Sequence, residues 1–103
     1  MRRGTTPTLL FTTPYDADIV RSGYITFTSR GNVILDIPTS DENVTIMNQY
    51  ISLTLTQAQT LAFNVSGTCL VQIRLILNND AVVASNIVKV PVEGILKEGE
   101  ING

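Results

Sequence analysis

The chain has 103 residues, a formal net charge of −2 and no histidine, and hydrophobic residues make up 44% of it. This length is typical of one small domain with a single hydrophobic core. Seven basic and nine acidic residues create no overall positive field, so we expect neither nucleic acid nor an anionic membrane as a partner.

Charged residues are scarce, at 16% of the chain against roughly 25% in an average soluble domain. One interpretation is that part of the surface is covered by another subunit. The other is a small β protein whose outer faces carry Thr, Ser and Asn in place of charged residues. The composition leaves both interpretations open.

The side chains on which most enzymes depend are missing. The absence of histidine removes the commonest general base and the commonest zinc ligand. Cys69 is the single cysteine, so no intrachain disulfide can form, and we expect it to be a small core residue. Asp16 and Asp18 resemble the first two ligands of a calcium loop, but the glycine and the closing glutamate of such a loop do not follow. We therefore predict a protein that is not an enzyme and binds no cofactor, metal or small-molecule ligand.

Alternation of apolar and polar residues predicts strands along most of the chain. After an extended arm over residues 1–6, the expected strands are 8–13, 22–29, 32–37, 44–47 and 50–56, followed by a long hairpin over 69–92 with its turn at 78–80. The side chains expected to face the core are Ile25, Phe27, Val33, Leu35, Ile37, Ile51, Leu53, Leu55, Val71, Ile73, Leu75 and Leu77. Pro7 cannot donate a backbone hydrogen bond, so the first strand is expected either to lie at the edge of a sheet or to begin just after Pro7.

One segment departs from the strand pattern. Thr56 and Gln59 have the spacing of a capping box, which predicts a short helical connection over residues 57–63. Leu61 and Phe63 would then fall on the core. Seven strands separated by turns at intervals of roughly 8–12 residues are typical of an all-β sandwich. We predict one domain over residues 1–92, including the arm, and a carboxyl-terminal tail over 93–103.

Two parts of the chain are candidates for an interface. Charges of opposite sign and three aliphatic residues gather at the two ends, so the ends of neighbouring copies could meet head to tail, although solvated termini explain the same pattern. The end residues concerned are Arg2, Arg3, Glu93, Ile95, Leu96, Glu98, Glu100 and Ile101.

The second candidate lies in the second arm of the hairpin. There Val83 and Ile87 occupy odd-numbered positions, whereas the other apolar residues occupy even-numbered positions and would face the opposite side of a regular strand. Val83 and Ile87 mark a surface for a partner if the strand is regular. A bulge at 85–86 would instead reverse the alternation of side chains along the strand and explain the pattern without a partner.

The segments MRRGTTPTLLF (1–11), LTLTQAQTLAF (53–63), VQIRLIL (71–77) and SNIVKVPVEGILKEGEI (85–101) resemble a group of short proteins encoded in phages and prophages of Gram-positive bacteria. More distantly, the chain is similar to the immunoglobulin-like amino-terminal modules of phage baseplate upper proteins. The resemblance implies an immunoglobulin-like antiparallel β-sandwich that serves as a virion structural part in a tail, a baseplate or a head-attached assembly. It also implies synthesis in the host bacterial cytoplasm, since no apolar leader segment is visible, and then incorporation into the virion.

The expected partners are further copies of the chain or another virion protein. A second hypothesis is a small cytoplasmic phage protein that binds and inhibits a host factor, because such an inhibitor needs no catalytic residues either. A third is a carbohydrate-binding module for host attachment. Only Tyr15, Tyr24 and Tyr50 could form its aromatic platform, and tryptophan is absent.

Overall fold

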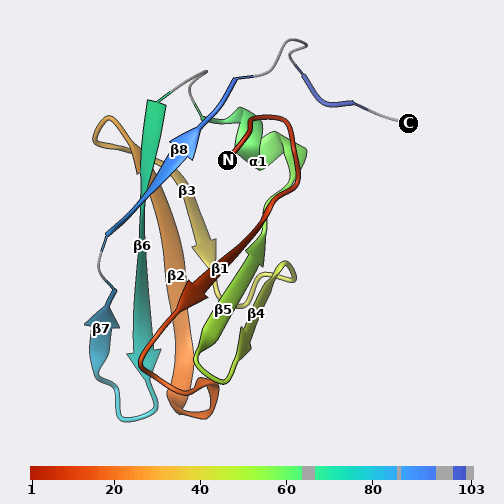
Figure 1. Ribbon diagram of the computed structural model, residues 1–103. Coiled ribbons are helices and arrows are strands. Elements are labelled where there is room, and N and C mark those ends of the chain that lie inside the picture. Colours follow the sequence, from red (N-terminus) through yellow and green to blue (C-terminus); the bar gives the residue numbers. More distant parts are fainter. Residues whose placement is uncertain (64–66, 86, 95–98, 102–103) are drawn as a thin grey trace.

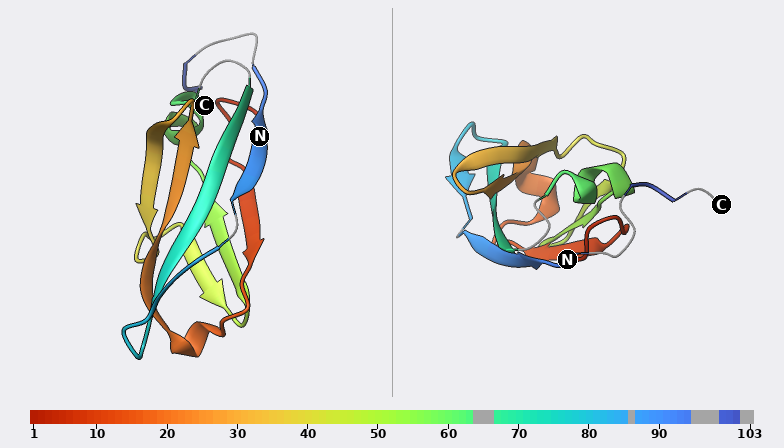
Figure 2. Two further views of the ribbon diagram at one scale, coloured as in Figure 1. Left: turned by 90° about the vertical axis from the view of Figure 1, so that its left-hand side faces the viewer. Right: turned by 90° about the horizontal axis from the view of Figure 1, so that it is seen from above.

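The computed structural model describes residues 1–63, 67–85, 87–94 and 99–101, which form two facing antiparallel sheets (Figures 1 and 2). The smaller sheet has the order β1–β5–β4, with β1 at Thr8–Thr12, β4 at Val44–Met47 and β5 at Tyr50–Thr54. The larger sheet runs β3–β2–β6, and β7 and β8 both pair with the other side of β6. Its strands are β2 (Val20–Ser29), β3 (Asn32–Pro38), β6 (Gly67–Leu77), β7 (Val82–Ala84) and β8 (Val88–Val92). The all-β sandwich predicted from the sequence is confirmed.

The core lies between the two sheets and is built from alternate residues of their strands. Its fully or almost fully buried apolar side chains are Ile25, Phe27, Ile37, Ile51, Leu53, Leu55, Phe63, Cys69, Val71, Ile73, Leu75, Leu77 and Val92. The rings of Phe27 and Phe63 meet edge to face, with their centroids 5.8 Å apart, an arrangement that aromatic pairs favour. The inward positions predicted in β2, β5 and β6 are therefore confirmed.

Gly23 lets the two central strands of the larger sheet approach each other closely. It lies opposite Leu75 of β6 and is buried. A Cβ atom at this position would lie 2.3 Å from the carbonyl oxygen of Arg74 and 2.8 Å from Cδ2 of Leu75. Because any larger residue would push β2 and β6 apart, glycine here serves packing.

A register shift between β2 and β3 overturns one predicted core position. From the pair Phe27–Leu35 to the pair Thr28–Val33, β2 advances by one residue and β3 by two. The extra residue, Ile34, is partly buried against the core. Val33 is 63% exposed, so its predicted inward orientation is wrong, because a bulge reverses the alternation of side chains beyond it.

A second register shift splits the last predicted strand into β7 and β8, which gives eight strands in place of about seven. From the pair Arg74–Ala84 to the pair Val71–Val88, β6 moves by three residues and the opposite chain by four. Ser85 fits into this bulge: its N–H donates to Ile73 O (2.8 Å), and its hydroxyl oxygen accepts from the N–H of Ile73 (3.0 Å). The chain thus gains one residue relative to β6 between Ala84 and Val88, which agrees with the local explanation of the change in alternation.

The helix α1 (Gln57–Leu61) connects the two sheets, as predicted, but ends two residues before position 63. The N–H of Gln59 donates to Oγ1 of Thr56 (3.1 Å), and the N–H of Thr56 donates to Oε1 of Gln59 (2.9 Å). These two bonds make the predicted capping box. A short 3-10 helix, η1 (Ala17–Ile19), replaces part of the loop expected between the first two strands.

The amino-terminal arm and α1 lie at the same end of the sandwich (Figure 1). Met1 O accepts from the N–H of Glu93 (2.8 Å), and the N–H of Arg3 donates to Glu93 O (2.9 Å). These bonds form a parallel bridge beside the end of β8. The hydroxyl of Thr60 in α1 also donates to Thr5 O (2.9 Å), so the arm is tied both to the larger sheet and to the helix.

Candidate functional site

Both arginines of the arm bind within the chain. The guanidinium of Arg2 pairs with the carboxylate of Glu93 (2.7 Å) and donates to Gly94 O (2.7 Å). Both side chains of the ion pair are about half exposed, and exposed pairs of this kind contribute little stability. One pair of the opposite charges that predicted a head-to-tail contact between copies, Arg2 and Glu93, thus meets inside one molecule.

Arg3 has a different role from Arg2 because it is 8% exposed. Its Nε donates to Phe63 O (2.7 Å), and its Nη2 donates to Leu61 O (3.0 Å). These are carbonyl groups at the end of α1, where a positive side chain is favourable. Arg3 therefore holds the arm against the helix, and its side chain is almost fully buried within the chain.

The remaining end candidates are only partly described. Glu93, Glu100 and Ile101 are exposed, whereas Ile95, Leu96 and Glu98 lie outside the described residues. The amide of Gln57 holds the backbone of Ile101 through two hydrogen bonds, of 3.1 Å to Ile101 O and 2.9 Å from Ile101 N. This contact places the side chain of Ile101, 64% exposed, near the start of α1.

The two hairpin candidates lie in different surroundings. Val83 pairs with Leu75 and packs against the core, because the bulge that follows leaves it on the inner face of the sheet. Ile87 is 58% exposed. With side chains of β2 and β6, among them Thr28 and Leu70, it lines a shallow hollow of about 370 Å³. The structure therefore separates two residues that would have shared one surface if the strand were regular.

The smaller sheet carries no charge on any of its three strands, whose sequences are TLLFT, VTIM and YISLT. On its outer face Thr8 and Thr54 share a hydrogen bond between their hydroxyl groups (2.9 Å). Leu10, Met47 and Tyr50 are 65%, 61% and 48% exposed. An uncharged sheet with exposed large apolar side chains is a candidate for protein contact.

One edge of this sheet is open. The N–H of Leu55 donates to Pro7 O (3.0 Å), and the N–H of Thr13 donates to Gln49 O (2.9 Å), so the odd-numbered residues of β1 form the hydrogen-bonded pairs with β5. In an antiparallel ladder the intervening residues direct their N–H and C=O groups to the opposite side. Thr8, Leu10 and Thr12 therefore present their backbone groups at an edge with which no strand pairs in the described part of the chain.

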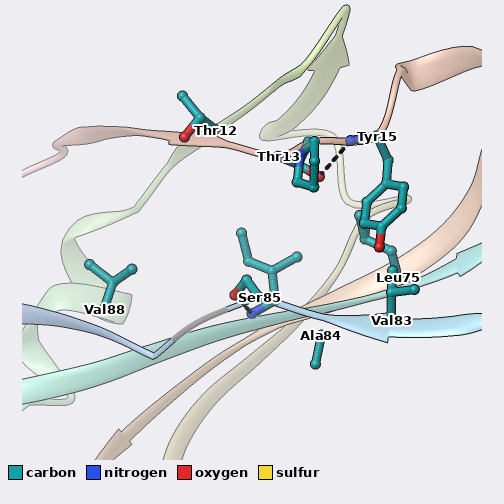
Figure 3. A pocket seen from close by; sticks show the side chains of 10 residues that line it. Thr12, Thr13, Tyr15, Leu75, Val83, Ala84, Ser85 and Val88 are labelled. Atoms are coloured by element: carbon teal, nitrogen blue, oxygen red, sulfur yellow. Dashed lines mark hydrogen bonds between the residues drawn. The ribbon is translucent and has the colours of Figure 1, made fainter.

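A groove of about 450 Å³ opens between the two sheets next to this edge. Figure 3 shows Thr12, Thr13 and Tyr15 along one wall and Val83, Ser85 and Val88 along the other. The backbone N–H of Tyr15 donates to Oγ1 of Thr13 (3.3 Å). Ile73 and Leu75 of β6 also line the groove, although both side chains are almost fully buried.

The other sheet edges carry features that discourage strand pairing. In β3 these are Asp36, Pro38 and the bulge, and at the opposite edge of the larger sheet they are Lys89, Pro91 and a second bulge. Natural proteins protect free edges with such charges, prolines and bulges. β4 is limited to four residues. β1 has five residues and none of these features between Pro7 and Pro14, which makes its edge the best-formed candidate site.

Little in the described residues suggests chemistry. Burial raises the pKa of the Cys69 thiol, so it stays protonated and unreactive near neutral pH. Among residues 1–63, 67–85, 87–94 and 99–101, no group of three His, Cys, Asp or Glu side chains could hold a metal ion. Asp16 and Asp18 line a hollow with Asn48 but are not joined by a third acidic ligand. No helix in the described residues is long and apolar enough to cross a membrane.

No family model, curated protein or solved structure matches this chain. The candidate site therefore rests on the geometry of the chain alone. From Pro7 the sequence analysis gave an edge position of the first strand as one of two alternatives, and it did not identify that edge as a site. The available signal was the run of six uncharged residues between Pro7 and Pro14, in which Leu10 alternates in step with the polar residues Thr8 and Thr12.

Proposed function

We propose that this chain is a non-enzymatic structural or assembly component of a phage virion that acts through protein–protein contacts. The observation that carries the proposal is the unprotected edge of β1, which belongs to a sheet whose strands carry no charge and borders a groove between the two sheets. A soluble protein that functions alone protects such an edge. An assembly component instead uses it to bind a neighbouring subunit.

The strand order supports the immunoglobulin-like part of the proposal. The order β1–β5–β4 facing β3–β2–β6–β7 corresponds to strands B–E–D facing C′–C–F–G of an immunoglobulin-like sandwich. The position of strand A beside β1 is left open, and residues 1–3 instead pair beside the end of β8. This supports the similarity to the immunoglobulin-like modules of baseplate proteins.

The carbohydrate-binding hypothesis is not supported by the placement of the tyrosines. Tyr24 projects from β2 of the larger sheet, Tyr50 from β5 of the smaller sheet, and Tyr15 lies at the groove. Three rings on three surfaces do not form the flat platform on which a sugar stacks. An inhibitor of a host factor would use the same kind of surface as a virion component, so an experiment must distinguish these two hypotheses.

Mass spectrometry of purified phage particles tests the proposal. We expect the chain in the particles, at a copy number comparable with that of other minor structural proteins. A particle that lacks the chain, together with its recovery on a bacterial protein in pull-downs from infected cells, would contradict the proposal and favour the inhibitor.

A further inference from the structure

We propose that two copies of this chain pair through the free edge of β1, antiparallel and about a twofold axis at Leu10, so that their smaller sheets form one continuous sheet. This inference rests on the proposed function, because it names the partner of the same edge. The partner is a second copy of the chain, and the contact is a strand-to-strand ladder.

The backbone geometry of β1 suits this pairing. Thr8, Leu10 and Thr12 direct their N–H and C=O groups away from β5, as the bonds at Pro7 and Thr13 require. Each hydrogen-bonded residue pair of an antiparallel ladder exchanges two bonds. With Leu10 opposite Leu10 of the second copy, the two edges exchange about six bonds, and every outward backbone group of β1 gains a partner.

The side chains of β1 are self-complementary in this register. Around Leu10 the outward residues read Thr, Leu, Thr, so Thr8 of each copy lies opposite Thr12 of the other, and the two leucines meet on the axis. The hydroxyl bond between Thr8 and Thr54 within the chain (2.9 Å) shows that facing threonines of this sheet can pair. Cross-strand Thr–Thr and apolar pairs both stabilise antiparallel strands.

Charge does not oppose the antiparallel arrangement. No strand of the smaller sheet is charged, so two edges of β1 meet without repulsion along the ladder. The turn with Asp16 and Asp18 follows β1. Antiparallel pairing places the two acidic turns at opposite ends of the ladder, whereas parallel pairing would bring them together.

The size of the contact indicates a modest affinity. A specific interface of small size takes about 600 Å² from each copy, and the chain exposes 6355 Å², so the contact would cover about a tenth of the surface. A five-residue strand is only about 17 Å long, and its edge supplies part of that area. The rims of the 450 Å³ groove beside it must supply the rest, and we expect a dissociation constant in roughly the micromolar range.

Sedimentation equilibrium of the full chain over a range of concentrations is the first test. We expect reversible association to twice the 11.2 kDa mass of the chain. Leu10→Lys places two like charges face to face on the axis and should weaken the association on the order of tenfold or more. Met47→Lys is the matched control, because Met47 is equally exposed on β4 of the same sheet, and this variant should associate like the unmodified chain.

A cross-linking test fixes the register. In a hydrogen-bonded antiparallel pair the Cα atoms lie about 5.5 Å apart, a distance that a disulfide spans. Leu10→Cys should therefore oxidise to a covalent dimer at concentrations where Met47→Cys stays monomeric. The native Cys69 is buried and does not compete. Because Leu10 is exposed, circular dichroism of both variants should match that of the unmodified chain.

Several results would overturn the inference. A chain that stays monomeric at millimolar concentration lacks the contact, and sensitivity to Met47→Lys in place of Leu10→Lys would move the contact to β4. Assembly into species larger than a dimer would indicate that β1 pairs with an edge other than β1 of the second copy. These outcomes are distinct from failure of the proposed function: a monomer found in virions would overturn only the inference, and a dimer absent from virions would overturn only the function.

Discussion

Adjacent arginines in the arm should differ sharply in their contribution to stability. Arg3 donates two hydrogen bonds to carbonyl groups at the end of α1 and is almost fully buried. Hydrogen bonds to a charged group contribute about 1.5–3 kcal/mol each. The hydrogen bond to Leu61 O is only partly buried, so in the variant water can bind this carbonyl group and offset part of the loss. Arg3→Ala should therefore lower the free energy of unfolding by about 3 kcal/mol. Arg2→Ala removes an exposed ion pair and should cost about 1 kcal/mol or less.

Urea denaturation followed by circular dichroism measures both changes, since the chain has no tryptophan for a fluorescence signal. Arg3→Met is a further control, because it keeps the packing of the long side chain and removes only the donors. It should retain most of the loss seen with Arg3→Ala. A loss for Arg2→Ala that equals or exceeds the loss for Arg3→Ala would refute the assignment of the arm contact to Arg3.

Three further predictions concern the larger sheet. Gly23→Ala should destabilise the fold by about 2 kcal/mol, since overpacking exceeds the gain from a less flexible unfolded chain, while Ser22→Ala in urea denaturation should change little. Ser85→Ala should cost about 1–2 kcal/mol in the same assay, because the N–H of Ile73 loses its acceptor at the bulge. Burial raises the pKa of the Cys69 thiol above 9.0, so the folded state holds this proton more tightly than the unfolded state does. The stability that this group contributes is present below pH 9 and is lost as the pH rises further. Between pH 8 and pH 10 the free energy of unfolding should therefore fall less in Cys69→Ala than in the unmodified chain.

Local patterns predicted the parts of the fold that depend on local rules. Alternation located β5 and β6 with their inward residues, because a side-chain period of two follows from the backbone of any strand. The capping box at Thr56 was visible because its donors and acceptors lie three residues apart. Where the ladder contains a bulge, the pattern failed. The exposure of Val33 and the division of the last arm into β7 and β8 depend on how the partner strand accommodates an extra residue.

The candidate site was harder to predict because it depends on topology. Pro7 was consistent with an edge strand, but the protection of both edges of the larger sheet became apparent only once the strand order was known. The role of Arg3 depends on contacts across about sixty residues of sequence, which no local pattern encodes. The charges at the two ends were recognised, but their pairing within one chain could not be distinguished from pairing between copies.

Amide hydrogen exchange along β1, measured by NMR at low and high protein concentration, tests the central claim most directly. The amides of Leu9 and Phe11 face β5 and should be protected at both concentrations. The amides of Thr8, Leu10 and Thr12 should exchange quickly in the dilute protein and become protected as the concentration rises, because they then bind the second copy. Exchange at these three amides that stays fast at every concentration would contradict the account.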